Sequence, residues 1–585
     1  MHALAVRSSI AAFVAAAALG LLAAPNCGGS SGNTPPATKD GGVATKDPPQ
    51  VPARAEFDVV AFGRVLGTIA PCGCTTEPLG GLQYAFGWLA AQGPDDAHLV
   101  VEPGSFLYPD PKGPYAPGDA AGWEQAESRA TLLHERFAAL GAQLVSGVGP
   151  FDLVAPAGVK ALATHALPRT VANLPLPADS PIARHRLVTL QSQGVRWSVG
   201  VTQVIDPATA GLDALGKPEP PVPALQRELA AMQAAGAKFT VVLAHGPRTF
   251  AESLAKEVPG LGLIVVGTAE GVERQRVGTP ATKMNGAWIL EPGEMLQTVS
   301  RVRLSIDASG GVVPEPSTWT MAAGRADLER ELSRVNARLA KFKADPSADA
   351  SFVERLERER ERLEREIAAP PEGAAVVTFE QVKVTCRLPV DQGAKQALGD
   401  YDKRVAASNL ARFTGVKPPA PAKGQSGYAG IERCNECHEE AVAFWRTTVH
   451  SHAWQTLVDD DKQLDLSCVS CHVTGFRKPG GSELVENAGL RDVQCEVCHG
   501  AGALHADDGG SKAGLVTLST TSQLCTGECH TPEHSDTFDY VPYLRDVLGK
   551  GHGEAARAKL GEGPTGAELR KAGLEKAGGA CKKAM

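Results

Sequence analysis

The 585-residue chain lacks a strong net charge and has a single long apolar run. Its formal net charge is -8, and Lys and Arg form no dense basic stripe, so nothing in the charge pattern supports a nucleic-acid partner. The apolar run, at residues 10–24, is short and rich in alanine, and no later run is long enough to cross a bilayer. We therefore expect no transmembrane span in the mature chain. The length predicts about two to four domains.

The N-terminus is typical of an export signal, because Arg7 precedes the apolar run. We predict an export signal over residues 1–26 and a flexible linker, rich in Gly, Pro and Thr, over residues 27–54. The mature chain could begin after Ala24, or at Cys27 if that thiol carries a lipid anchor, and the sequence leaves both open. The expected location is periplasmic or outer-membrane-associated on the exported side.

Short β-branched apolar runs alternate with helical patterns in residues 55–312. Examples of the apolar runs are FDVVAFGRVLG, AHLVVEP and FTVVLAHG. An example of the helical patterns is ESRATLLHERFAAL. This alternation predicts a layered α/β domain.

The apolar pattern of residues 313–414 predicts a helical hairpin followed by a strand. Apolar residues recur every three or four positions on both sides of the break ADPSAD, at Leu328, Leu332, Val335, Leu339, Val353, Leu356, Leu363 and Ile367. We interpret the hairpin as a solvated spacer without chemistry. AAVVTFEQVKVTCRLPV then predicts a strand that could rejoin the α/β domain, and residues 415–427 predict a second linker.

Cysteine and histidine are concentrated beyond that linker. Eight of 13 cysteines lie between Cys434 and Cys529, and nine of 15 histidines lie between His438 and His552. Four motifs place a histidine directly after the second cysteine of a pair. They are CNECH (Cys434, Cys437, His438), CVSCH (Cys468, Cys471, His472), CEVCH (Cys495, Cys498, His499) and the wider CTGECH (Cys525, Cys529, His530).

This pattern predicts covalently attached haem c. Two thiols three positions apart can add to the two vinyl groups of one haem, and the adjacent imidazole can ligate its iron. Zinc sites and disulfides also use paired cysteines, but neither requires the histidine that follows. We expect four haems, with His438, His472, His499 and His530 as proximal ligands. The wider spacing at Cys525 and Cys529 makes the fourth haem the least secure.

The opposite face of each iron needs another ligand. All six methionines lie outside the haem segment, which leaves five further histidines: His450, His452, His505, His534 and His552. We favour His452, His505 and His552 as distal ligands, keep His534 as a candidate, and interpret His450 as a surface residue. Bis-histidine ligation predicts a low-potential carrier.

Residues 428–556 resemble the tetrahaem cytochromes c of the c-554 type. The four motifs carry the resemblance, together with HSHAWQTL, VQCEVCHGAGALH and CHTPEHSDTFDYVPYL. It implies a loop-rich, mainly helical electron carrier in the periplasm that meets redox partner proteins, with His505 on a neighbouring haem. The three-residue spacer at Cys525 departs from the usual motif, and residues 557–585 would form a C-terminal tail.

The α/β region resembles the exported metallophosphoesterases of the 5′-nucleotidase kind, on GTIAPCGCTTEPLGGL, VVEPGSF, SGVGPFDL and VVLAHGP. That resemblance implies a two-metal hydrolase, but the ligand positions have changed. Arg64 and Leu66 replace the opening Asp and His, Ser105 replaces the bridging Asp, and residues 147–150 read GVGP. The last motif, residues 267–270, reads GTAE. Among these ligand positions only His245 keeps the expected residue, and we interpret it as structural rather than as a metal ligand.

Cys72 and Cys74 leave three alternatives open: a disulfide with each other, a redox-active pair, or pairing with Cys386 or Cys581. We expect a multidomain electron carrier rather than an enzyme, with the α/β region as a catalytically silent scaffold or docking module. A redox enzyme acting on a small nitrogen or sulfur compound at an open iron is the alternative, and an active phosphoesterase is the weakest reading.

Overall fold

The computed structural model describes residues 54–71, 75–93, 95–177, 180–268, 272–307, 320–322, 325–344, 349–368, 375–486, 489–532, 534–578 and 581. Cys27, Cys72, Cys74 and Glu270, and the predicted export signal, lie outside these residues. Among the described helices, none has both the length and the apolar character that a bilayer span requires.

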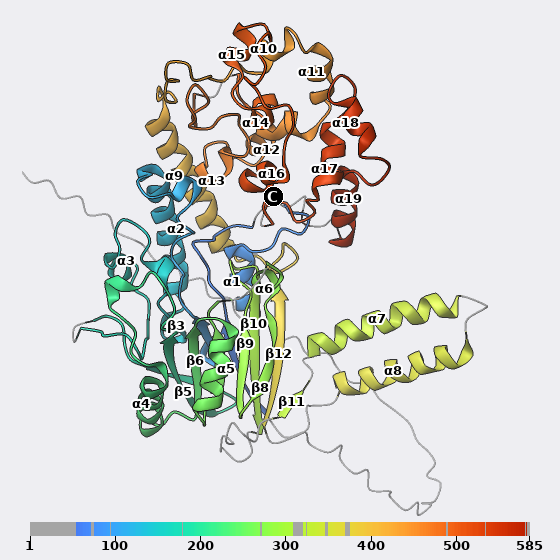
Figure 1. Cartoon of the computed structure of the whole chain (residues 1–585). Coiled ribbons are helices and arrows are strands. Elements are labelled where there is room, and N and C mark those ends of the chain that lie inside the picture. The colour runs from blue at the N-terminus through green and yellow to red at the C-terminus, as the bar shows by residue number, and fades with distance from the viewer. Residues whose placement is uncertain are drawn as a thin grey trace, which may run out of the picture. The chain divides into compact units, whose positions relative to one another are not determined.

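Two six-stranded sheets form the α/β region (Figure 1). The first has the order β11-β12-β10-β1-β2-β3, and the second has the order β4-β5-β6-β7-β9-β8. The first contains β1 (Arg54–Ala61), β2 (His98–Glu102), β3 (Leu144–Ser146), β10 (Thr298–Asp307), β11 (Thr320–Ala322) and β12 (Ala375–Lys383). The second contains β4 (Arg186–Ser192), β5 (Val195–Ile205), β6 (Phe239–His245), β7 (Leu263–Val266), β8 (Thr279–Met284) and β9 (Ala287–Glu291).

The two sheets face each other across a buried apolar layer. Phe57 and Val59 of β1 pack with Trp197 and Val199 of β5 and with Val241 of β6. Neighbouring residues point the other way because side chains alternate along a strand, so the outer faces of both sheets are apolar too.

Helices cover these outer faces. Helices α1 (Leu82–Ala90), α2 (Ala120–Ala138) and α9 (Gln392–Phe413) share a core with the first sheet, and α4 (Pro221–Ala234) and α5 (Arg248–Glu257) share one with the second. The smaller helices of this region are α3 (Lys160–Thr164) and α6 (Val272–Val277). The predicted α/β layers are confirmed, as helix, sheet, sheet and helix.

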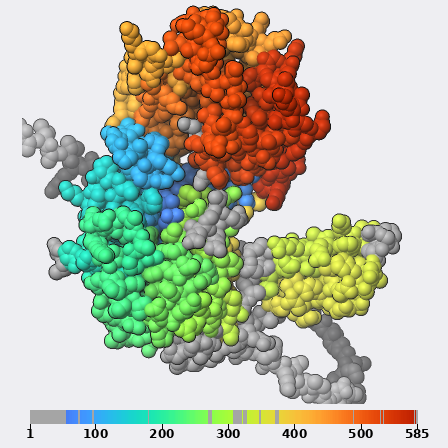
Figure 2. Space-filling view, in the orientation of Figure 1, coloured from blue at the N-terminus to red at the C-terminus, as the bar shows by residue number. Residues whose placement is uncertain are grey.

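The predicted helical hairpin is confirmed as α7 (Arg325–Lys343) and α8 (Ala350–Ala368). Val335, Leu339, Leu356 and Leu363 form its own small core, and Lys343 pairs with Glu357 at 2.6 Å. Figure 1 shows the two helices side by side, and in Figure 2 they form one yellow-green to yellow body. The strand after the hairpin, β12, runs antiparallel to β10 and parallel to β11, so it does rejoin the first sheet.

The C-terminal segment is loop-rich and mainly helical, as predicted. Its helices are α10 (Ile431–Asn435), α11 (Glu439–Trp445), α12 (Ala453–Asp459), α13 (Leu466–Val469), α14 (Cys495–His499), α15 (Ala503–Asp507), α16 (Ser522–Glu528), α17 (Tyr540–Val547), α18 (Glu554–Lys559) and α19 (Gly566–Lys576). The last stretch of the chain, treated as a tail in the sequence analysis, contains α19, which packs against α17.

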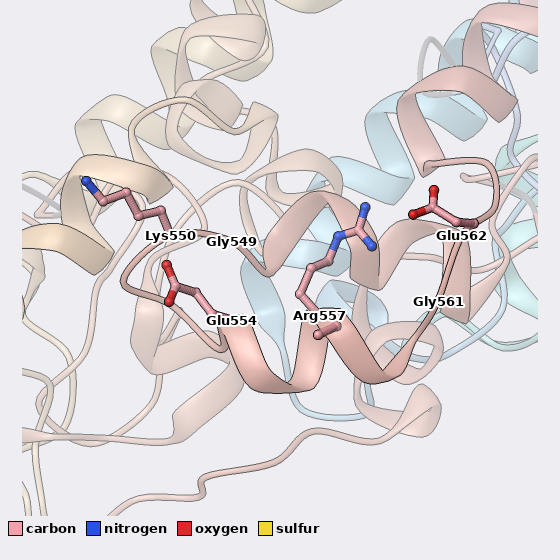
Figure 3. Close-up of a pocket in the computed structure, with 7 residues that line it drawn as sticks. Gly549, Lys550, Glu554, Arg557, Gly561 and Glu562 are labelled. Carbon is pink, nitrogen blue, oxygen red and sulfur yellow. The ribbon is translucent and has the colours of Figure 1, made fainter.

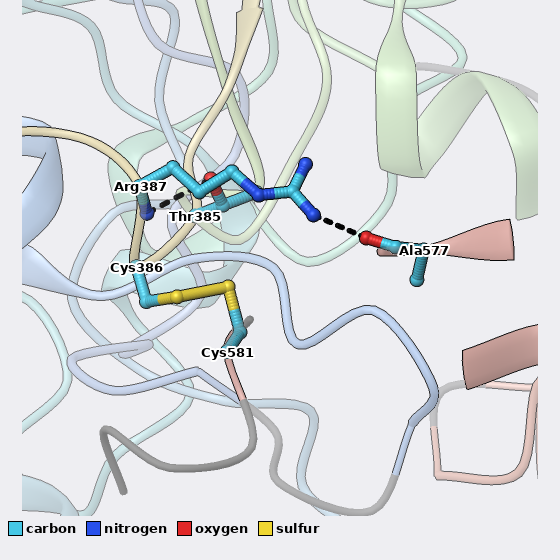
Figure 4. The surroundings of a disulfide bond; sticks show 5 residues. All are labelled: Thr385, Cys386, Arg387, Ala577 and Cys581. Atoms are coloured by element: carbon cyan, nitrogen blue, oxygen red, sulfur yellow. Dashed lines mark hydrogen bonds between the residues drawn. A yellow bond between two sulfur atoms is a disulfide. The ribbon is translucent and has the colours of Figure 1, made fainter. Parts of the chain in front are cut away.

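A disulfide joins Cys386, just after β12, to Cys581 near the C-terminus (Figure 4). Arg387 also donates a hydrogen bond to the carbonyl oxygen of Ala577. Because Cys386 and Cys581 pair with each other, neither pairs with Cys72 or Cys74 in this structure.

Candidate functional site

Short helices carry the cysteine–histidine motifs. Asp465 caps α13, where its carboxylate accepts a hydrogen bond from the Ser467 amide at 2.9 Å, and Cys468 follows in the same turn. Helix α14 contains the whole third motif and ends at Gly500, whose φ of 84° suits glycine. Each of these two motifs therefore begins in a short, defined helical turn.

The thiols of different motifs lie near one another. The side chains of Cys434 and Cys495 form a hydrogen bond, which together with burial raises the pKa of Cys434. Cys498 interacts electrostatically with Cys525, and burial raises the pKa of Cys498 to about 11. The third motif thus contacts the first through the Cys434–Cys495 thiol pair and is within electrostatic range of the fourth.

The eight motif cysteines form no disulfide in the part of the chain that the structure describes. Within those same residues, no three Cys, His, Asp or Glu side chains converge on a point that could hold one ion.

Three histidine pairs bring a motif histidine opposite a histidine from elsewhere in the segment. The ring centroids of His438 and His505 are 6.3 Å apart with planes at 15°. Those of His499 and His552 are 5.9 Å apart with planes at 84°.

The third pair is His450 and His530, whose ring centroids are 6.3 Å apart with planes at 51°. Burial, followed by the nearby His450, lowers the pKa of His530 to about 4, and burial lowers the pKa of His450. Both imidazoles are therefore neutral near pH 7, the form in which histidine binds a metal.

The spacing of all three pairs fits one iron between two imidazoles. An imidazole nitrogen binds a transition metal at about 2 Å, and the ring centroid lies about 1 Å behind that nitrogen, so two imidazoles on opposite sides of one metal have centroids about 6 Å apart. The donor set therefore fits an iron that two imidazoles would hold at three of the four motifs.

Backbone carbonyls orient several of these rings. Nδ1 of His472 lies 2.5 Å from the Ala453 oxygen, Nδ1 of His499 lies 2.5 Å from the Thr517 oxygen, and Nδ1 of His552 lies 2.7 Å from the Val547 oxygen. A carbonyl only accepts, so each Nδ1 carries the hydrogen and donates it. Nε2 of each ring then keeps its lone pair for a metal.

The structure places one histidine, His450, differently from the sequence-based interpretation. His450, interpreted above as a surface residue, is half-buried and faces His530, whereas His452 and His534 are exposed. The sequence HSH, residues 450–452, does not indicate which of its two histidines is the more buried. The orientation of the two rings depends on contacts with residues far along the chain.

The fourth motif keeps its geometry despite the wider spacer. The amides of Cys529 and His530 donate to the Cys525 carbonyl at 3.2 and 2.9 Å, so the extra residue is absorbed in a helical turn. The His530 ring stacks on Phe538 at 4.6 Å, and its Nδ1 lies 3.0 Å from the Ser535 hydroxyl.

Arg64, which replaces one expected metal ligand, and Asp152, which follows the GVGP stretch, both have structural roles. Arg64 forms a two-point ion pair with Glu294 at 2.8 and 2.9 Å. Asp152 accepts hydrogen bonds from four backbone amides, at 2.9 to 3.0 Å, those of Ser105, Phe106, Leu107 and Gly149.

The His245 ring also has a hydrogen-bond partner in the folded protein. Its Nδ1 lies 3.0 Å from the Pro103 carbonyl, and burial lowers its pKa to about 4. A Cβ at Gly149 would lie 2.3 Å from Ser105 Oγ and 2.7 Å from His245 Cε1, so the space beside His245 is closed. The described residues do not fit a two-metal centre.

One pocket opens beside the turn that carries His552 (Figure 3). Gly549, Lys550, Glu554, Arg557, Ala558, Gly561 and Glu562 line it. Two basic and two acidic side chains balance each other, so we assign it no chemistry.

Comparison with known proteins matches part of the C-terminal segment to one family. The family described as "Cytochrome c554 and c-prime" matches residues 433–500. Cytochrome c-554 of Nitrosomonas europaea is 31% identical over 91 residues, a match that covers 13% of this chain and 39% of that protein. The chain thus spans less than half the length of this relative. The predicted resemblance of the C-terminal region to cytochrome c554 is confirmed.

Several solved structures are similar to parts of the chain. The reduced state of cytochrome c554 from Nitrosomonas europaea is 24% identical, covers 20% of this chain and 80% of its own, and has a TM-score of 0.16. A 5′-nucleotidase precursor from Thermus thermophilus is 15% identical, with 60% and 59% covered and a TM-score of 0.40. A calcineurin-like phosphoesterase from Bacillus subtilis is 16% identical, with 44% and 87% covered and a TM-score of 0.34.

Proposed function

We propose that this protein is an exported multihaem c-type cytochrome that carries electrons through four covalently bound haems. The observation that carries the proposal is the set of three histidine pairs, each joining a motif histidine to a second imidazole at 5.9 to 6.3 Å. Thiols of the first and third motifs, Cys434 and Cys495, interact with each other.

The chain's residues divide into anchors and ligands. The eight motif cysteines would form the thioether bonds, and His438, His472, His499 and His530 would bind the four irons. We assign His505 to the iron of His438, His552 to that of His499, and His450 to that of His530. Haem supplies reversible one-electron chemistry when it is bound. The carbonyls that hold Nδ1–H of His472, His499 and His552 keep these rings from turning.

We propose that the α/β region is catalytically silent and serves the cytochrome segment as a scaffold or docking module for redox partner proteins. Support comes from the two-point Arg64–Glu294 ion pair and from the backbone bonds that occupy Asp152 and His245. An export route is supported by the Cys386–Cys581 disulfide, since such bonds persist in oxidising compartments. Lipid attachment at Cys27 stays a proposal.

Stoichiometric reduction tests the carrier role. The purified exported protein should take up four electron equivalents per chain from dithionite and return them to an added oxidant, with reversible visible spectra. Steady consumption of a small nitrogen or sulfur compound would instead favour the redox-enzyme alternative. Metal-dependent hydrolysis of a phosphate ester that is lost in His245→Ala would contradict the silent α/β region.

A further inference from the structure

We infer that helix α2 of the α/β region positions and tunes the second haem site, with Arg129 as the positioning residue. The inference rests on the proposed function, because it concerns the turn that carries Cys468. It gives the α/β region a role beyond that of a scaffold, because this region would set the position and the reduction potential of one of the four haems.

Arg129 makes direct contacts with this turn. Its Nη2 donates to Ser467 Oγ at 2.8 Å and lies 3.4 Å from both carboxylate oxygens of Asp465. Its Nε donates to the Tyr401 hydroxyl of α9 at 2.9 Å, and its guanidinium lies 5.6 Å from the Tyr115 ring centroid. Four groups thus hold one guanidinium, which restricts its motion.

Asp465 receives a second bond from the same face of α2. Gln125 lies one turn before Arg129, and its Nε2 donates to Asp465 Oδ1 at 2.6 Å. The Gln125 oxygen accepts from Asn409 Nδ2 of α9 at 3.1 Å and from the Leu466 amide at 3.2 Å. Gln125 is 3% exposed and Asp465 is 8% exposed, so water cannot replace these bonds.

Apolar packing surrounds this polar network. Leu466 and Val469, on either side of Cys468, share a buried cluster with Ala121 of α2 and Phe413 of α9. The turn is therefore held by polar contacts from α2 and by an apolar cluster to which α2, α9 and the C-terminal segment all contribute.

The pair of charges beside Cys468 gives the contact an electrical consequence. Both Arg129 and Asp465 act electrostatically on the Cys468 thiol, with opposite signs. A buried cation near a haem favours the ferrous state and raises its reduction potential, and a buried anion lowers it. Arg129 and Asp465 should therefore shift the reduction potential of the second haem in opposite directions, and the observed potential should reflect both.

The experiment is a potentiometric titration of the full-length haem-loaded protein. Arg129→Gln should lower one of the four haem potentials, Asp465→Asn should raise the same one, and the double variant should return it close to the wild-type value. Arg129→Lys, which keeps the charge, should shift it least. Arg136→Gln is the matched control, because Arg136 lies on the same helix and pairs with Asp391 at 3.0 Å, away from the cytochrome segment.

Haem content separates the possible failures. If wild-type protein holds no haem, the proposed function fails before any variant is compared. Loss of one haem in Arg129→Gln that Arg129→Lys restores would also support positioning. Four retained haems with unchanged potentials, or shifts of the same sign in Arg129→Gln and Asp465→Asn, would overturn the inference.

Discussion

At the scale of single residues, His450 and His452 show what a sequence pattern leaves undetermined. They are two positions apart in one turn, yet His450 is half-buried opposite His530 and His452 is exposed. The motif histidines were identifiable because the reaction that attaches haem requires them beside the cysteines. Distal histidines obey no such spacing rule, and three-dimensional contacts select them.

Replacement of His450 should change the spin state of one iron. We expect His450→Ala to convert one low-spin ferric haem to high-spin, because an alanine supplies no sixth ligand. Electron paramagnetic resonance of the oxidised protein measures this change. The same change in His452→Ala would show that His452 also binds an iron, whereas an unaltered spectrum in His450→Ala would remove His450 from the ligands.

Acid should destabilise the α/β region through His245. Burial lowers its pKa to about 4 in the folded protein, whereas an unfolded chain binds the proton near the ordinary value of 6.5. Stability from this residue is therefore fully present above pH 6.5 and is lost as the pH falls toward 4.

Urea unfolding of wild type and His245→Gln at pH 7 and pH 5 measures the effect. Wild type should lose about 2 kcal/mol more than the variant between these values, since one pKa unit corresponds to about 1.4 kcal/mol. Arg64, Asp152 and Asp206 face His245 in both proteins, so their contributions largely cancel. Equal losses in the two proteins would rule out His245 as the source.

At the scale of elements, periodicity predicted some helices and missed others that had the same signal. The α7–α8 hairpin was predicted from its apolar seam. Helix α9 buries Ala394, Leu398, Tyr401 and Val405 at spacings of four, three and four, and was not singled out. Helix α19 begins with a capping box of Thr565 and Glu568, and was treated as a tail.

Sheet order had no comparable signal in the sequence. The runs that became β1 and β10 are far apart in the chain, yet they pair along their full length, from Arg54 with Asp307 to Ala61 with Ser300. Strand pairing depends on which apolar faces meet in the folded chain, and this is not a local property.

The hairpin should behave as a unit with its own core. Leu363 is 1% exposed within that core, so Leu363→Ala should cost about 2 to 5 kcal/mol locally. Hydrogen exchange should become faster in α7 and α8 and stay unchanged in β10 and β12. Arg365→Ala, at an exposed position on the same helix, should leave both unchanged. Faster exchange in β10 would show that the hairpin supports the sheet.

At the scale of the whole molecule, covalent and polar links join the α/β region to the C-terminal segment. Besides the Arg129 network, the Thr76 amide and hydroxyl donate to the Asp536 carboxylate at 2.7 to 3.2 Å. The Cys386–Cys581 bond closes a loop across a sequence separation of 195 residues. Of these links, only the disulfide restricts the unfolded chain as well as the folded one.

Loss of the disulfide should lower thermal stability. Closing so long a loop typically contributes about 2 to 5 kcal/mol. Cys386→Ala, Cys581→Ala and the double variant should all unfold at the same temperature, below that of the oxidised wild type, in circular dichroism melts. A wild-type melting temperature in all three would mean that non-covalent contacts alone hold the C-terminus.

The central claim of covalently bound haem is tested most directly by the intact mass and visible absorbance of the exported protein, made in a host competent for c-type cytochrome maturation. The account predicts a red protein with a Soret band and a mass equal to the mature chain plus four haem groups. Three haems would contradict the assignment of the wider motif at Cys525 and Cys529 alone. A colourless, zinc-containing product with the mass of the bare chain would contradict the account as a whole.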